Sequence, residues 1–86
     1  MKFYTQPDGK RNICGDRIRE ARLHRRLSQP ELCKLLQLHG VMVERDVISR
    51  MESGIRIVTD FEAVSIAEVL EVPVQWLLGK DNRPAW

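Results

Sequence analysis

The sequence predicts an all-α fold of five short helices. Apolar residues recur at three- and four-residue spacing in several segments, and two segments begin with a capping box. No stretch alternates apolar and polar residues as a half-buried strand would. A chain of 86 residues, of which 43% are hydrophobic and 30% charged, is long enough for one domain with its own core. We therefore expect a single helical bundle.

The first twelve residues are expected to form an N-terminal arm. Residues 1–12 contain a proline and a glycine and show no hydrophobic period. Phe3 and Tyr4 are its aromatic residues, and we expect them to pack back on the domain. The bundle itself is expected over residues 13–79, and residues 80–86 are expected to be a flexible tail.

The first helix is predicted from about residue 13 to Arg26. Cys14, Ile18 and Ala21 are spaced by four and three residues, which places them on one apolar stripe. Arg22 lies beside this stripe rather than opposite it. The helix is therefore expected to pack against the core along that stripe.

A capping box begins the second helix, which is predicted over residues 29–39. Ser28 can accept a hydrogen bond from the third backbone N–H, while Glu31 reaches back to the N–H of Ser28. Pro30 falls in the first turn, where no N–H partner is lost. The apolar residues of this helix are Leu32, Cys33, Leu35, Leu36 and Leu38. We therefore expect it to be buried over a wide arc.

The third helix is predicted over residues 45–53. Ile48 and Met51 are three residues apart and can face a core, and Gly54 is suited to end the helix. Its other side carries Arg45, Asp46, Ser49 and Arg50. A helix this short is not stable alone in water. The bundle must therefore hold its apolar side, and its polar side is available for a function.

A second capping box, Thr59 with Glu62, begins a fourth helix that is predicted to end near Glu71. Its inward residues are expected to be Ala63, Val64, Ala67 and Leu70. A last short helix is predicted from Val74 to Leu78. It is rich in apolar residues, so we expect Leu77 to belong to the core, while Trp76 could belong either to the core or to a dimer surface.

Two consecutive short amphipathic helices suggest a helix-turn-helix, and the residues around them resemble a known family. The matching residues are Leu27-Ser28-Gln29, Leu32, Leu36, Val43, Ile48 to Gly54, Phe61, Ile66, Ala67, Leu70, Val72 and Trp76 to Gly79. They resemble the small DNA-binding domains of the lambdoid phage repressors, Cro and the Xre-like regulators. The resemblance implies a five-helix lambda-repressor-like bundle that reads the major groove with residues 45–53, usually as a dimer.

The sequence departs from the family pattern in the link between the second and third helices. Ser28 and Ile48 are twenty positions apart, five more than in most members, although a Xre-like subgroup with a longer link is similar. We expect the extra residues to lengthen the second helix and to form a small core of their own from Leu35, Leu38, Val41 and Met42. Glu44 replaces the usual small N-cap, and Pro73 stands where Ser or Asp usually caps the fifth helix.

The resemblance places the outward residues of the third helix against DNA bases. Arg45 suits guanine O6 and N7, and Asp46 can accept a hydrogen bond from cytosine N4. Ser49 and Arg50 could contact a base or a phosphate. The alternative is that these four side chains are only solvated.

Four further residues have candidate roles, of which those of Gln29, Arg22 and Glu52 are implied by the same resemblance. Gln29, at the start of the second helix, would hold a phosphate near free backbone N–H groups, and Arg56 is a weaker phosphate candidate. Arg22 and Glu52 would form an ion pair beneath the recognition helix and not contact DNA. The alternatives are a simple helix-start residue for Gln29 and an exposed pair for Arg22 and Glu52.

The charge distribution fits an anionic partner. Residues 1–27 carry eight Lys and Arg against three acids, a net charge of +5, whereas residues 28–86 carry a net charge of −3. A basic first third can lie on DNA, although a solvated helix face would look the same. No run approaches the roughly 18 apolar residues that a membrane span needs, and no signal peptide begins the sequence. We expect a cytoplasmic protein.

No metal site, cofactor or enzymatic activity is expected. The cysteines Cys14 and Cys33 and the histidines His24 and His39 lack the paired spacing of a zinc site. The two thiols are expected to be buried as small hydrophobes. No nucleophile–base pair and no phosphate-binding glycine loop is visible.

The sequence therefore predicts a transcriptional regulator that binds double-stranded DNA. We expect a repressor of phage or mobile-element type that binds a short palindrome as a homodimer. The alternative is an antitoxin or another protein–protein interaction module on the same fold, with a partner bound through the arm or the tail. The acidic residues Glu44 and Asp46 on the reading face favour that alternative.

Overall fold

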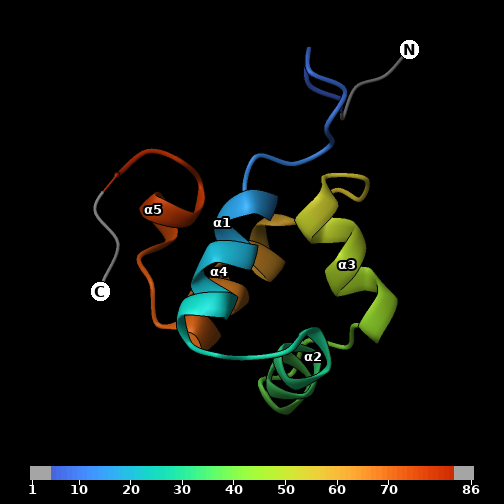
Figure 1. The fold of residues 1–86 in the computed structure, drawn as a ribbon, viewed down its shortest axis with the longest axis vertical. Helices are drawn as coiled ribbons and strands as arrows, with labels where there is room; N and C mark the ends of the chain where they lie inside the picture. The colour runs from blue at the N-terminus through green and yellow to red at the C-terminus, as the bar shows by residue number, and fades with distance from the viewer. Residues whose placement is uncertain (1–4, 83–86) are drawn as a thin grey trace.

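The computed structural model describes residues 5–82, so the expectations for Phe3, Tyr4 and residues 83–86 lie outside the described residues. The described chain forms α1 (Gly15–His24), α2 (Gln29–Leu38), α3 (Arg45–Ser53), α4 (Asp60–Leu70) and α5 (Val74–Leu77), with no strand among residues 5–82. The predicted all-α, five-helix bundle is thus confirmed. α1 and α4 lie at its centre, α2 and α3 pack on one side, and α5 packs on the other (Figure 1).

Both predicted capping boxes are present. The Ser28 hydroxyl accepts from the Glu31 N–H at 3.1 Å, and the Ser28 N–H donates to Glu31 Oε1 at 2.8 Å. At the start of α4, the Thr59 hydroxyl accepts from the Glu62 N–H, and the Thr59 N–H donates to Glu62 Oε1 at 3.0 Å. Each box satisfies backbone donors that a helix N-terminus would otherwise leave free.

α1 is shorter than expected at its C-terminal end. It ends at His24 rather than near Arg26, because Arg26 takes the left-handed backbone conformation with φ of 59°. The N–H of Leu27 then bonds to Arg22 O at 3.0 Å and closes the turn toward α2. At its other end α1 begins at Gly15, close to α3. A Cβ at position 15 would lie 2.4 Å from the carbonyl oxygen of Met51.

One core joins all five helices. Its buried hydrophobic residues are Cys14, Ile18, Ala21, Leu32, Cys33, Leu36, Val41, Val43, Ile48, Met51, Ala63, Ile66, Ala67, Leu70, Val72, Trp76 and Leu77. The expectation that Val64 faces inward was wrong, since it is 47% exposed and Ile66 is buried instead. Spacing alone could not decide between them, because α4 is apolar on most of its circumference.

The link between α2 and α3 does not form the small core that was expected. Leu38 is 75% and Met42 85% exposed, while Val41 is buried. Polar contacts hold the link instead: the Gln37 side-chain amide and the Cys33 thiol both donate to Val43 O, at 2.9 and 3.3 Å. Of the four apolar residues expected to form that small core, only Val41 is therefore buried, and it joins the main core.

The C-terminal segment is fastened to α1. Trp76 is 2% exposed, so of the two places that the sequence left open for it, it takes the core. The guanidinium of Arg17 lies 4.9 Å from the centre of the Trp76 ring and donates to Trp76 O and Asp81 O, both at 2.7 Å. Residues 80–82 are thus bound to the bundle rather than loose.

The two cysteines are buried and not bonded to each other. Burial raises the pKa of the Cys14 thiol to about 11, so this thiol stays protonated at neutral pH. Across residues 5–82 no group of His, Cys, Asp and Glu side chains could hold a metal ion. None of the described helices has the length and apolar character to cross a membrane.

Candidate nucleic-acid interface

The two sides of α3 have different surroundings. Ile48 and Met51 are 0% and 1% exposed on its inner side, where α1 and α2 pack. Gly54 follows the helix with φ of 83°, a left-handed conformation that ends it. The range that the structure gives to α3, Arg45–Ser53, coincides with the one expected from the sequence. The inner side thus anchors the helix, and the outer side faces solvent.

Four polar residues occupy the exposed outer side of α3: Arg45, Asp46, Ser49 and Arg50. Arg50 Nη2 lies 3.4 Å from Asp46 Oδ2, with 60% and 57% of these side chains exposed. Such an exposed pair, one helical turn apart, contributes only about 0.3–0.5 kcal/mol. The side chain of Arg45 makes no hydrogen bond or ion pair with any other residue in the described part of the chain. These side chains can therefore turn to a ligand at little cost to the fold.

The N-terminus of α2 lies beside the last turn of α3. The side-chain amide of Gln29 donates to Glu52 Oε1 at 3.1 Å. Hydrogen bonds from the backbone N–H and the hydroxyl of Ser28 lower the pKa of Glu31, so a negative charge is fixed at this helix start. That charge offsets part of the positive helix dipole. The structure thus directs the amide of Gln29 toward α3, and its phosphate contact stays a prediction.

A buried ion pair joins α1 to α3. Arg22 Nε donates to Glu52 Oε2 at 2.7 Å and Arg22 Nη2 to Glu52 Oε1 at 3.0 Å. The two side chains are only 9% and 4% exposed. Arg22 Nη1 also donates to Leu27 O at 2.8 Å, in the turn before α2. Together with its bond from Gln29, the Glu52 carboxylate thus connects α1, α2 and α3.

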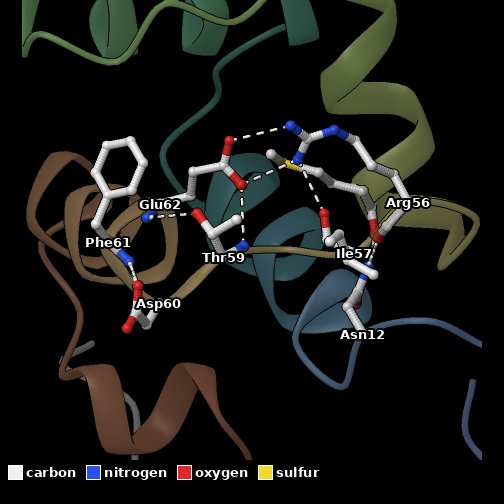
Figure 2. Close-up of polar contacts among 8 residues, drawn as sticks. Asn12, Arg56, Ile57, Thr59, Asp60, Phe61 and Glu62 are labelled. Atoms are coloured by element: carbon white, nitrogen blue, oxygen red, sulfur yellow. Dashed lines mark hydrogen bonds and ion pairs between the residues drawn. The ribbon is translucent and has the colours of Figure 1, made fainter. Parts of the chain in front are cut away.

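Arg56 follows α3 and binds another carboxylate (Figure 2). Its Nη1 and Nη2 donate to the two oxygens of Glu62 at 3.0 and 3.1 Å, and Nη1 also donates to Ile57 O. Burial opposes ionisation of Glu62, but the hydrogen bonds from Arg56 and Thr59 outweigh it, so the pKa of Glu62 is lowered. The guanidinium of Arg56 is therefore already bound by groups of the protein itself, the Glu62 carboxylate and Ile57 O.

Asn12 is a structural residue that the sequence did not reveal. Its side-chain amide donates to Met51 O at 2.9 Å and to Arg56 O at 2.8 Å (Figure 2). Its side-chain carbonyl accepts from the Gly15 N–H at 2.7 Å. The two carbonyls belong to residues 39 and 44 positions away. An asparagine before a helix signals only a local cap, so nothing in the local pattern pointed to this long-range role.

α2 has a capped start, a link joins it to α3, and α3 has a buried inner side and an exposed polar outer side. These features define a helix-turn-helix protein. Comparison with protein families agrees, since the helix-turn-helix family HTH_3 matches residues 18–77. The chain belongs to this Xre and lambda-repressor-like family of DNA-binding helix-turn-helix regulators. No curated protein matches the chain.

Proposed function

We propose that the protein is a sequence-specific transcriptional repressor of phage or mobile-element type, which acts in the cytoplasm and reads the major groove with α3. The observation that carries this proposal is the exposed face of Arg45, Asp46, Ser49 and Arg50, on a helix whose other side is buried. Rigid support of a reading helix favours specific contacts, because the side chains approach bases in a fixed register.

Each outward residue has a role that fits its chemistry. Arg45 has no competing partner in residues 5–82 and would bind guanine O6 and N7 as a fork. Asp46 would accept from cytosine N4 or orient Arg50, its partner at 3.4 Å. Ser49 would contact a base or a phosphate, and Gln29 a phosphate near the start of α2.

We further propose that two copies bind one palindromic site, as the family resemblance implies. Symmetric half-sites would then be separated by about one helical turn of DNA, roughly 10 base pairs. The aromatic core of α5 supplies no surface for this dimer, because Trp76 and Leu77 are 2% and 0% exposed. The contact between copies must use other residues.

The test is selection of bound sequences from a random pool of double-stranded DNA. We expect enrichment of one motif with inverted half-sites, and binding that weakens steeply as salt is raised. The control is Arg45→Ala, which should lose base preference at one position of each half-site. Recovery of no enriched sequence would contradict the proposal.

A second candidate function is a protein–protein interaction module, such as an antitoxin. An apolar groove of about 630 Å³ favours it; its lining residues are Thr5, Gln6, Arg11, Asn12, Ile13, Cys14, Val58, Asp60, Ala63, Val64, Val74 and Leu78. This groove lies between the arm, α4 and α5, not at the outer side of α3. A chain that selects no DNA would support this candidate over the first.

A further inference from the structure

We propose that Phe3 and Tyr4, in the N-terminal arm, bind in the chain's own apolar groove between the arm, α4 and α5. This is the groove of about 630 Å³ described above, and none of its lining residues belongs to α3. The inference goes beyond the proposed function, because it does not depend on DNA. It names the segment that covers an apolar surface which residues 5–82 leave open.

The walls of the groove are apolar and incompletely covered. Ile13, just before α1, is 56% exposed, and Val64 on α4 is 47% exposed. Val74 on α5 and Leu78 after it line the other side and are only partly buried. Apolar surface in a concave site gains free energy when another apolar group displaces the water from it. An apolar side chain is therefore the occupant that this groove favours.

The arm is held at the groove by its own hydrogen bonds. Thr5 and Gln6 are both lining residues. The backbone N–H of Gln6 donates to Lys10 O at 2.7 Å, and its side-chain amide donates to Asn12 O, also at 2.7 Å. These bonds fix the place at which the preceding residues meet the bundle.

The residues directly before Thr5 have the length and the side chains to fill the groove. One residue of extended chain spans at most about 3.6 Å, so the Cα of Phe3 lies within about 7 Å of the Cα of Thr5. Phe3 and Tyr4 are both aromatic, and such side chains bury about 150–250 Å² each when they are covered. The groove is thus within reach of the most apolar part of the arm.

A cation at the groove suits aromatic occupants. Arg11 lines the groove and is exposed, and its guanidinium makes no hydrogen bond or ion pair within residues 5–82. A guanidinium binds the face of an aromatic ring, and it can also donate to the hydroxyl oxygen of Tyr4, which needs a partner when the ring is buried. Arg11 therefore gives the two rings a polar contact beside the apolar walls.

The arm has an advantage over any separate occupant, because it is covalently attached beside the groove. Such an attachment gives an effective concentration on the order of millimolar. A second copy of the chain or an unrelated protein would first have to displace it. The arm thus acts as a strap that decides whether the groove is open to a protein partner.

The direct test is NMR of the full chain with labelled Val and Leu methyl groups. We expect nuclear Overhauser effects from the ring protons of Phe3 and Tyr4 to the methyl groups of Val64, Val74 or Leu78, with intensities that do not change on dilution. The absence of all these effects overturns the inference. Effects between labelled and unlabelled copies in a mixed sample would place the arm in the groove of a second copy and overturn it too.

Substitution of both aromatic residues gives an independent test. For Phe3→Ser combined with Tyr4→Ser we expect stronger fluorescence of the apolar dye anilinonaphthalene sulfonate, because the groove is opened. The melting temperature should fall by about 4–8 °C, a usual shift for a small loss of stability in a domain of this size. Unchanged dye fluorescence would contradict the inference.

A groove variant and a matched control show where the two aromatic residues bind. Val64→Ser should lower the melting temperature less in the doubly substituted chain than in the wild type, because the contact that it removes is already lost there. Phe61→Ser changes a side chain that is 60% exposed on the same helix but does not line the groove. Its effect should be the same in both chains. Equal effects of Val64→Ser in the two chains would overturn the inference, whatever the outcome of the DNA selection.

Discussion

At the scale of single residues, the position of α3 depends most on Glu52. Its buried carboxylate accepts from Arg22 on α1 and from Gln29 on α2. For Glu52→Ala we expect the free energy of unfolding to fall by about 3–5 kcal/mol, because Arg22 would remain buried without its partner. Urea denaturation followed by circular dichroism measures this loss.

The exposed ion pair of Arg25 with Glu71 offers a matched control, since 38% and 70% of these side chains are exposed. Arg25→Ala should cost no more than about 1 kcal/mol. Equal losses for Arg25→Ala and Glu52→Ala would show that burial does not set the importance of the Arg22–Glu52 pair.

The outward arginines of α3 should affect binding but not stability. We expect Arg45→Ala and Arg50→Ala each to weaken binding to the selected site by about 1–3 kcal/mol and to relax base preference. Neither side chain is buried, so the melting temperature should stay the same. Titration of fluorescent DNA duplexes measures the affinity. If binding to all sequences weakens equally, these arginines contact phosphates rather than bases.

Glu62 makes stability depend on pH. Its pKa is lowered in the folded state, so at acidic pH the unfolded chain binds more protons at this position than the folded chain does. The contribution is fully present above the ordinary glutamate pKa of about 4.3 and is lost as pH falls through the lower folded value. Thermal melts between pH 7 and pH 3 should show this loss. Glu62→Gln should flatten that part of the profile; an unchanged profile would contradict the assignment.

At the scale of elements, the close approach of α1 to α3 depends on Gly15. A Cβ at this position would lie 2.4 Å from Met51 O and 2.9 Å from Glu52 O, both backbone atoms of α3. For Gly15→Ala we expect the free energy of unfolding to fall by about 1–3 kcal/mol, the usual cost of overpacking, and DNA affinity to fall as α3 shifts. Denaturation and DNA titration measure the two effects.

Gly40→Ala is a control of a different kind. A Cβ added at Gly40 would meet no neighbouring atom. The φ of 93° at this position, however, is one that residues with side chains rarely adopt, so the change lowers stability through backbone strain alone. It should therefore destabilise the chain while the selected DNA sequence stays the same. If Gly15→Ala left both stability and DNA affinity unchanged, the tight contact between α1 and α3 would not be needed.

The helix boundaries were predictable where local chemistry sets them. The two capping boxes and Gly54 act within a few residues, so the starts of α2 and α4 and the end of α3 could be predicted from the sequence. The link could not, because Leu38 and Met42 are apolar whether or not a neighbour covers them. The Asn12 contacts were also missed, since they depend on how distant parts of the chain meet at the end of α3. The Arg56–Glu62 pair was missed because it depends on the conformation of the loop between α3 and α4.

At the scale of the whole molecule, Trp76 and Leu77 of α5 close the bundle rather than offering an apolar contact to a second copy. Trp76 and Leu77 are buried, and Arg17 covers the Trp76 ring. If two chains bind one palindrome, we expect DNA to supply much of the energy that brings them together. The mass of the complex, measured by analytical ultracentrifugation, should correspond to two chains per palindromic duplex. A complex with one chain at saturation would contradict this stoichiometry.

The division of α3 into a buried side and an exposed side has a consequence for evolution. Substitutions at Arg45, Asp46, Ser49 and Arg50 remove no buried contact, whereas those at Ile48, Met51 and Glu52 do. If these four residues read the operator as proposed, a lineage could exchange its operator for a new one by substitutions at these positions while the chain stays folded. For the same reason, a library randomised at these positions should yield many folded variants with new DNA targets.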